Sequence, residues 1–359
     1  MEPVNYGIVG FGGIAENRIA KEGFGLDRKR FTAPLGHHLV GASDVNPERE
    51  QAAAALGVKW YHNYEQLLED SRIHAVYVAT SNSTHYETAR SALLADKHVI
   101  IEKPMTTTAE EARDLMRLAG ERSLSLSVNL MMSKNVYNRK ARELIEKQVL
   151  GPVRYAAMHM EFLFGADPQE ARSWRCSFPA EIGGPVGDVG GHCLDMAEFL
   201  FQQRITSVRC VYYPETLNIS VENGAFIQYT MEDGTEGCVR SAFNQPRGGL
   251  LGTLSNLGYE IYGESGVMRG YGTLFQLSGH KDEPFRIRLE TETPEHFHTY
   301  YLSEPENIYQ AQLREHADSI RNNTPIDGSQ GYRNLLQVLA CHESARKGGK
   351  EVAVTDERP

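Results

Sequence analysis

Short apolar runs alternate with helical stretches through the first third of the chain, and this alternation limits the possible folds more than any other feature. The apolar runs, each long enough for a strand, lie at residues 6–9, 39–44, 75–80, 98–102 and 125–129. Helical patterns fill residues 47–56, 63–69, 84–95 and 108–121. Strands alternating with helices of this length predict βαβ units, and therefore a doubly wound parallel sheet with right-handed crossovers.

The pattern changes after about residue 130. A helix at residues 139–147 ends at Leu150-Gly151-Pro152. The strands expected beyond it lie at residues 153–164, 205–213, 224–231, 237–244, 257–262 and 266–270. Many of them alternate apolar and polar residues, and residues 231–235 carry a hairpin signal, so we expect a large, open and mostly antiparallel sheet with one solvated or partner-covered face. Helical segments at 307–322 and 331–347 follow.

A chain of 359 residues is too long for one ordinary core, and two domains are expected. The change of pattern divides them into residues 1–128, with an α/β fold, and residues 129–359, with an α+β fold. We expect the second domain to bind substrate and to form oligomer contacts. The helices at about 307–347 are expected to pack back toward the first domain.

Charge and cysteine content limit the classes of partner. A formal net charge of −10 without a basic stripe argues against nucleic-acid binding. No apolar run reaches membrane-spanning length. The five cysteines are scattered, odd in number and without zinc-site spacing, so we expect mostly buried free thiols. The N-terminus moves into a strand without a signal-peptide pattern, which favours a cytoplasmic protein.

A glycine-rich turn after the first strand predicts a dinucleotide site. Gly10, Gly12 and Ala15 match the pattern G-x-G-x-x-[GA]. Gly10 permits the tight turn, Gly12 lets the backbone approach a pyrophosphate, and Ala15 lets the helix pack closely on the strand. The N-terminus of the following helix offers N–H groups to the anion. The other turn residues expected at the cofactor are Phe11, Gly13 and Ile14.

Two further strand ends should complete the cofactor site. Asp44 should accept hydrogen bonds from the adenosine ribose, and its charge repels a 2′-phosphate, so NAD is favoured over NADP. In the alternative interpretation, Asp44 caps the helix before Pro47. The residues expected to line the nicotinamide side of the site are Thr80, Ser81 and Asn82.

Asp44 follows Gly10 by 34 residues, whereas a minimal unit places its acid about 20 residues on. Residues 21–37 are therefore an insertion. Its basic triplet, residues 28–30, lies in a solvated loop or contacts a cofactor phosphate.

A lysine is held at the end of the fourth strand, in the run Ile100-Ile101-Glu102-Lys103-Pro104. Pro104 restricts Lys103 to extended conformations. The carboxyl ends of strands in open parallel sheets are where ligands bind. We therefore expect Lys103 to lie in the active site.

Asp188, His192 and Asp195 are spaced at i, i+4 and i+7 and so share one helix face. Together with a dinucleotide turn and a lysine, the Asp/His pair indicates hydride transfer at an alcohol or ketone carbon. We assign His192 as general base, Lys103 as electrostatic partner and proton relay, and Asp188 as an acid that orients the substrate or Lys103. The alternatives are a metal site and a structural role, in which Asp188 caps the helix and His192 lies in a core.

Further residues are candidates for the substrate pocket. Trp174 and Arg175 precede a second glycine-rich turn, although core packing explains the tryptophan equally well. Asn129 and Tyr155 are additional candidate lining residues. The histidines expected at the surface are His62, His280, His296 and His298.

These motifs resemble those of the Gfo/Idh/MocA oxidoreductase family over nearly the whole chain. The first set is Val76-Tyr77-Val78-Ala79-Thr80-Ser81-Asn82, His85, Lys97-His98-Val99 and Glu102-Lys103-Pro104. The second set is Gly183-Gly184-Pro185 and residues 187–195, with an ending at Pro325-Ile326-Asp327-Gly328 and Glu343-Ser344-Ala345. The resemblance implies an N-terminal Rossmann domain with His85 and Glu102 among its cofactor residues. It also implies a C-terminal domain whose open sheet makes the contacts of a homodimer or homotetramer, and it argues against a metal.

One segment departs from the family pattern. Relatives often carry an arginine and an aromatic residue near the substrate, where this chain has Met131 and Met132. Met131 remains a candidate substrate-binding residue, but the identity of the substrate does not carry over.

The leading hypothesis is an NAD-dependent dehydrogenase that acts on a secondary hydroxyl of a sugar, sugar derivative or cyclitol. A rival is a glycosidase-type enzyme that retains NAD, because transient oxidation acidifies the neighbouring C–H and permits elimination. A second rival is a non-catalytic nucleotide-sensing regulator, against which the presence of Lys103, Asp188 and His192 argues.

Overall fold

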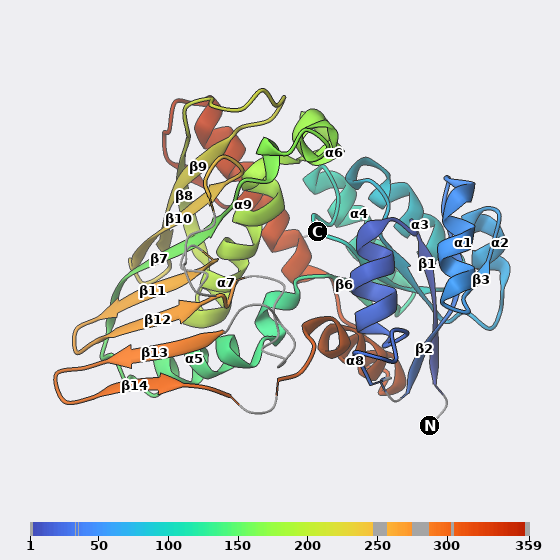
Figure 1. The fold of residues 1–359 in the computed structure, drawn as a ribbon, viewed down its shortest axis with the longest axis horizontal. Helices are drawn as coiled ribbons and strands as arrows, with labels where there is room; N and C mark the ends of the chain where they lie inside the picture. The colour runs from blue at the N-terminus through green and yellow to red at the C-terminus, as the bar shows by residue number, and fades with distance from the viewer. Residues whose placement is uncertain are drawn as a thin grey trace. The chain divides into compact units, whose positions relative to one another are not determined.

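A computed structural model describes residues 3–32, 34, 36–246, 257–274, 287–302 and 305–355. The chain divides into two compact units. Figure 1 shows their helices and strands, with colour running along the chain by residue number. Unit 1 combines the chain up to Met131 with Asn307–Leu335. Unit 2 combines Met132–Glu306 with the segment that begins at Leu336.

Unit 1 contains the predicted parallel sheet, with six strands in the order β3-β2-β1-β4-β5-β6. The strands are β1 (Val4–Val9), β2 (His37–Ser43), β3 (Lys59–Trp60), β4 (Ala75–Val78), β5 (His98–Ile101) and β6 (Leu126–Val128). Only β3 was not expected, because two residues leave no periodic pattern. The strand order reverses beside β1, between β1 and β4, and such a switch point is where open sheets of this kind bind ligands.

The helices of unit 1 follow the predicted positions closely. They are η1 (Ala15–Gly23), η2 (Pro47–Arg49), α1 (Glu50–Ala55), α2 (Tyr64–Glu69), η3 (Asn82–Thr84), α3 (His85–Leu94), α4 (Ala109–Glu121) and α8 (Ile308–Arg321). Helix α4 begins with a capping box, in which Thr108 Oγ1 accepts from the N–H of Glu111 and the Glu111 carboxylate accepts from the N–H of Thr108. The first helix, η1, is wound as a π-helix, which the sequence pattern does not indicate.

The insertion at residues 21–37 contributes to the core as well as to the surface. The ring centroid of the buried Phe24 lies 5.3 Å from that of Tyr6 on β1. The basic triplet at residues 28–30 is exposed, as expected for a solvated loop. Helix α8 fastens the start of this insertion, because Asn307 at its N-cap donates to the Glu22 carboxylate at 2.9 Å.

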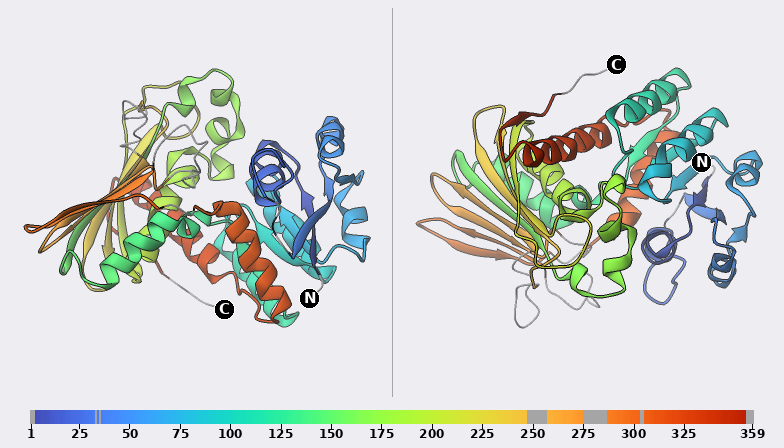
Figure 2. Two further views of the ribbon diagram at one scale, coloured as in Figure 1. Left: turned by 60° about the horizontal axis from the view of Figure 1, so that its bottom comes forward. Right: turned by 90° about the horizontal axis from the view of Figure 1, so that it is seen from above.

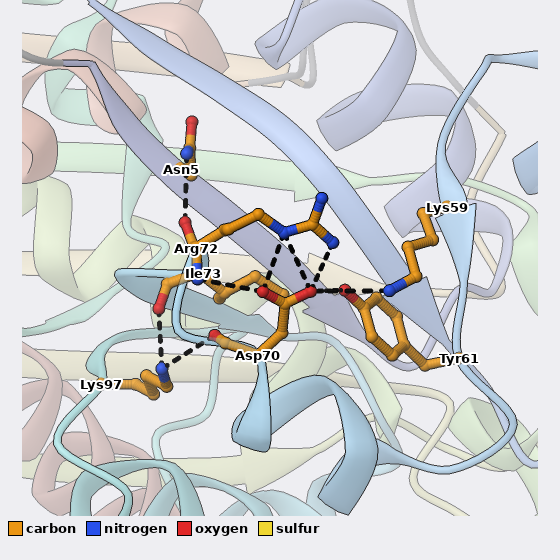
Figure 3. A network of polar contacts seen from close by, with 7 residues as sticks. All are labelled: Asn5, Lys59, Tyr61, Asp70, Arg72, Ile73 and Lys97. Atoms are coloured by element: carbon orange, nitrogen blue, oxygen red, sulfur yellow. Dashed lines mark hydrogen bonds and ion pairs between the residues drawn. The ribbon is translucent and has the colours of Figure 1, made fainter.

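A polar network joins several segments next to the start of β4 (Figure 3). The Asp70 carboxylate accepts hydrogen bonds from Tyr61 and from Arg72, whose Nη2 lies 2.6 Å away. Lys97 donates to the carbonyl oxygens of Asp70 and Ile73, at 3.1 and 2.8 Å. Lys97 therefore has a structural role in joining the chain segments that precede β4 and β5.

Unit 2 contains a nine-stranded sheet in the order β14-β13-β12-β11-β7-β10-β9-β8-β15. The strands are β7 (Val153–Glu161), β8 (Ile205–Tyr212), β9 (Gly224–Met231), β10 (Glu236–Ala242), β11 (Leu257–Gly263), β12 (Val267–Tyr271), β13 (Arg288–Glu292), β14 (Phe297–Tyr300) and β15 (Val352–Ala353). All neighbouring pairs are antiparallel except β7 and β10, which confirms the prediction of a mostly antiparallel sheet. The last three strands were not expected.

Helices cover one face of this sheet, as Figure 2 shows. The helices assigned to unit 2 include α5 (Val136–Glu146), α6 (Trp174–Ser177), the π-wound η8 (Val186–Gly190) and α7 (Gly191–Phe201), while α9 (Ser329–Arg346) contributes residues to both units. A side chain at Gly190 would meet Ile227 and Ser241, so η8 lies on the face that these residues share. The opposite face exposes Tyr155, Val211 and Phe226.

The structure also describes the state of the cysteines and the length and polarity of the helices. All five cysteines are buried free thiols. Among the described residues, no helix is both long and apolar enough to cross a membrane.

Candidate active site

The predicted cofactor residues of unit 1 lie along the carboxyl edge of its sheet. Backbone hydrogen bonds join the residues that end neighbouring strands: Gly10 N donates to Ser43 O, and Ala79 N donates to Val9 O. On the next strands, Glu102 N donates to Val78 O and Asn129 N donates to Ile101 O. These bonds, each 2.8–2.9 Å long, place Asp44, Gly10, Thr80, Lys103 and Asn129 along one edge.

The glycine turn has the geometry that a pyrophosphate requires. Gly10 has a φ of +87°, and a side chain there would lie 2.6 Å from the backbone of Ala79 and Thr80. A Cβ at Gly12 or Gly13 would have no atom within 4 Å, so the backbone of the turn is open to a ligand. The Phe11 side chain is fully buried, which leaves only its backbone for a cofactor. This open backbone at a helix start fits a bound dinucleotide.

Asp44 follows β2, and its Oδ1 accepts from the N–H of Asn46 at 2.8 Å. Asn46, not Asp44, caps the helix that begins at Pro47, since its side chain accepts from the N–H of Glu48. The alternative interpretation of Asp44 as the helix cap is therefore wrong. The neighbouring Val45 is fully exposed, an apolar surface beside the position expected for the adenosine.

The His85 ring contacts the segments that follow β4 and β5, near the carboxyl edge of the unit 1 sheet. Its Nδ1 lies 2.8 Å from the carbonyl oxygen of Pro104. Its Nε2 lies 3.3 Å from the carbonyl oxygen of Thr80. His85 is fully buried and Asn82 is nearly so, whereas Thr80 and Ser81 are partly exposed.

Lys103 follows β5 by two residues, is half-buried, and precedes a cis peptide bond to Pro104. The adjacent Glu102 carboxylate accepts from Tyr77 Oη at 2.6 Å and from Asn129 Nδ2 at 2.8 Å. Burial, reinforced by Glu102, holds the pKa of Tyr77 well above its usual range, so this phenol remains a donor. Glu102 thus joins β4, β5 and β6 and supports the backbone that carries Lys103.

In unit 2 the second glycine-rich turn wraps closely around Glu222. The Glu222 Oε1 accepts from the N–H of Val186, the first residue of η8, at 2.9 Å. Gly184 has a φ of +74°, and a Cβ there would lie 2.5–2.7 Å from the Glu222 carboxylate. Burial raises the pKa of Glu222 to about 7, against the effect of the Val186 N–H. Nothing in the local sequence pattern distinguishes Glu222 from a surface acid.

The residues predicted for chemistry in unit 2 follow this turn. Asp188 lies within η8, and its Oδ1 is 3.3 Å from Nε of Arg175, whose guanidinium lies over the Trp174 ring at 4.5 Å. His192 and Asp195 lie on α7 and are buried, with 4% and 7% of their surface exposed. The structure therefore brings Trp174, Arg175 and Asp188 together. The described residues contain no group of three His, Cys, Asp or Glu side chains that could hold a metal ion.

The remaining candidates have varied positions. Asn129 and Met131 are buried in unit 1. Tyr155 lies on the exposed face of the unit 2 sheet, opposite the face that η8 contacts, which argues against Tyr155 as a lining residue of the substrate pocket. The histidines found exposed, as predicted, are His62, His296 and His298; His280 lies outside the described residues.

Two family models and several known proteins match this sequence. Residues 4–130 match the family model described as "Oxidoreductase family, NAD-binding Rossmann fold", and residues 138–269 match the GFO/IDH/MocA C-terminal domain. The chain is 25% identical to 1,5-anhydro-D-fructose reductase of Ensifer adhaerens over 87% of this chain and 90% of the relative. It is 24% identical to inositol 2-dehydrogenase of Rubrobacter xylanophilus over 100% of this chain and 95% of that protein.

A solved structure confirms the fold at lower sequence similarity. The complex of levoglucosan dehydrogenase with NADH and levoglucosan superposes with a TM-score of 0.80 at 22% identity, covering 99% of this chain and all of that one. Both family models match in the expected order, on an NAD-binding Rossmann domain and the domain that follows it. The chain therefore belongs to the Gfo/Idh/MocA oxidoreductase family.

Proposed function

We propose that this protein is an NAD-dependent oxidoreductase that acts on a secondary hydroxyl or ketone of a sugar, a sugar derivative or a cyclitol. Relatives named as an anhydrofructose reductase and an inositol dehydrogenase support this substrate class. The observation that carries the proposal is the position of Lys103 at the carboxyl edge of an NAD-binding domain, after β5, the strand next to β4 at the switch point.

The residues proposed to hold NAD are those of the carboxyl edge. The open backbone at Gly12 and Gly13 suits the pyrophosphate, and Asp44 suits the adenosine ribose. Thr80 and Ser81, which are partly exposed, suit the nicotinamide side. When bound, NAD supplies the acceptor or donor of the hydride.

We assign the proton chemistry to three side chains. His192 Nε2 or Nδ1 takes the proton of the substrate hydroxyl, because imidazole exchanges protons near neutral pH. The Lys103 ammonium stabilises negative charge on the same oxygen and relays the proton. Asp188, which Arg175 positions by an ion pair, orients the substrate or Lys103. The other residues proposed to bound the substrate are Asn129, Met131 and Trp174.

The test is to incubate the purified protein with NAD and a panel of sugars, inositols, glycosides and their keto forms while NADH absorbance is recorded. A dehydrogenase accumulates NADH and a ketone in equal amounts. Cleavage of a glycoside without net NADH would instead support the NAD-retaining enzyme. NAD binding without turnover of any compound would overturn the enzymatic proposal.

A second test asks whether the proposed groups act together. If Lys103 and His192 serve the same oxygen, the double variant Lys103→Ala/His192→Ala should lose little more rate than the worse single variant. Independent multiplication of the two losses would contradict a shared role.

We further propose that the protein is a cytoplasmic homodimer or homotetramer. The five buried free thiols fit a reducing compartment. Val211 and Phe226 lie opposite each other on neighbouring strands and are 55% and 42% exposed, a surface suited to a second copy. Sedimentation that shows only monomer at micromolar concentration would contradict this assembly.

A further inference from the structure

Arg49 lies five residues after Asp44, on the segment that should face the cofactor ribose. Its Nε donates to the carbonyl oxygen of Phe11, within the glycine turn, at 2.7 Å. Its Nη2 forms an ion pair with Glu16 Oε2. The guanidinium of Arg49 is thus held by two acceptors from another part of the chain, one within the glycine turn and one just after it.

Glu16 follows the glycine turn and shares its single negative charge between two cations, Arg49 and Lys21. Its second oxygen, Oε1, accepts from Lys21 Nζ at 2.6 Å. The hydrogen bond from Lys21 lowers the pKa of the Glu16 carboxyl, and the hydrogen bond from Arg49 lowers it further, although partial burial opposes both. Glu16 is therefore anionic at neutral pH. A carboxylate in the first turn of η1 is favourable for the helix, and its contacts give Glu16 a second role, because it holds Arg49 and Lys21.

A 2′-phosphate on the ribose requires a cation where NAD requires only Asp44. Arg49 is a cation on the same short segment as Asp44, but its Nε and Nη2 already donate to acceptors of this chain. An arginine whose charge is already paired offers a phosphate much less than a free one does, because the existing ion pair must first be broken.

We propose that Glu16 is a second determinant of the preference for NAD over NADP, because it holds Arg49 against the Phe11 carbonyl and so withholds it from a 2′-phosphate. This inference rests on the proposed use of NAD. It implies that Asp44→Ser relaxes the discrimination against NADP only in part. The substitution removes the repulsion between Asp44 and the 2′-phosphate, but Arg49 stays paired with Glu16.

The experiment measures dissociation constants for NAD and NADP by calorimetry on the whole protein, without substrate. In an Asp44→Ser background, adding Glu16→Ala should tighten NADP binding about ten- to a hundredfold relative to NAD, the range of a hydrogen bond to a charged group. Adding Arg49→Ala to that double variant should abolish the gain. If Glu16→Ala does not fold, judged by circular dichroism, Glu16→Gln takes its place with a smaller gain.

A matched control removes a charge without releasing the arginine. Glu48 is exposed and lies on the same η2 segment, so Asp44→Ser/Glu48→Ala should bind NADP as Asp44→Ser does, within about twofold. If the Glu48 variant gains as much NADP affinity as the Glu16 variant, net charge explains the effect and the inference is wrong. If the gain of the Glu16 variant survives Arg49→Ala, the released cation is Lys21 and the inference is also wrong. A wild-type protein that fails to bind NAD would instead refute the proposed function.

Discussion

Replacing Glu222 by glutamine should remove a pH dependence from the stability of the turn that leads to His192. In the wild-type protein, burial raises the pKa of this carboxyl from 4.5 to about 7. The folded state therefore favours the protonated form. The contribution of Glu222 to stability is full below about pH 4.5 and is lost as the pH rises through about 7.

The magnitude follows from the two pKa values. Their difference corresponds to about 3 kcal/mol between the protonation states. Glutamine stays neutral, and its amide oxygen can still accept from the N–H of Val186, a bond of 2.9 Å in the wild type. We expect Glu222→Gln to match the wild type at pH 4.5 and to be more stable by up to about 3 kcal/mol at pH 8.

Because a chain of two units need not unfold in one step, the assay should be local. Hydrogen exchange of the amides at residues 186–192, compared between the two proteins at each pH, reports on this turn. Protection in the variant should exceed that in the wild type by up to about a hundredfold at pH 8, since each 1.4 kcal/mol is a factor of ten. The exposed Glu295→Gln serves as control. Equal protection of wild type and Glu222→Gln at pH 8 would show that the carboxyl is not held protonated.

Three further outcomes test the assignment of the chemistry and of the cofactor turn. Lys103→Ala should lower kcat by about 10²–10³-fold, the loss typical of one charge-stabilising donor, with a much smaller change in NAD affinity. His192→Ala should abolish turnover while the thermal midpoint stays near that of the wild type, with partial recovery at high pH as hydroxide replaces the base; a destabilised but active variant would indicate a structural histidine. Gly10→Ala should destroy NAD binding in calorimetry, because its Cβ would lie 2.6 Å from the backbone of Ala79 and Thr80 at a φ of +87°; retained affinity would refute the location of the turn.

Much of unit 1 could be predicted because its signals are local. Every strand of the parallel sheet except β3 is a short apolar run, and three of the helices described between strands begin at a capping side chain, at Asn46, Asn63 and Thr108. The turn at Gly10 and the position of Lys103 after a strand are also local features. Where one stretch of chain specifies its own conformation, the sequence suffices.

Contacts between distant segments were decided by the tertiary structure alone. The strands β13 and β14 have few apolar positions and are stabilised by pairing with β12 and with each other. The parallel pairing of β7 with β10 joins residues separated by about 80 positions, which no hairpin signal describes.

The same limit applies to the candidate site. Glu222 becomes a proton-binding group only because Gly184 and Val186 enclose it, and Arg49 is paired only because Phe11 and Glu16 meet it across the turn. The sequence identifies Glu222 and Arg49 as charged residues. The burial of Glu222 and the partners of Arg49 depend on segments more than thirty residues away. The sequence by itself therefore determined the fold class, the family motifs and the candidate residues, and the tertiary structure determined how those residues are held.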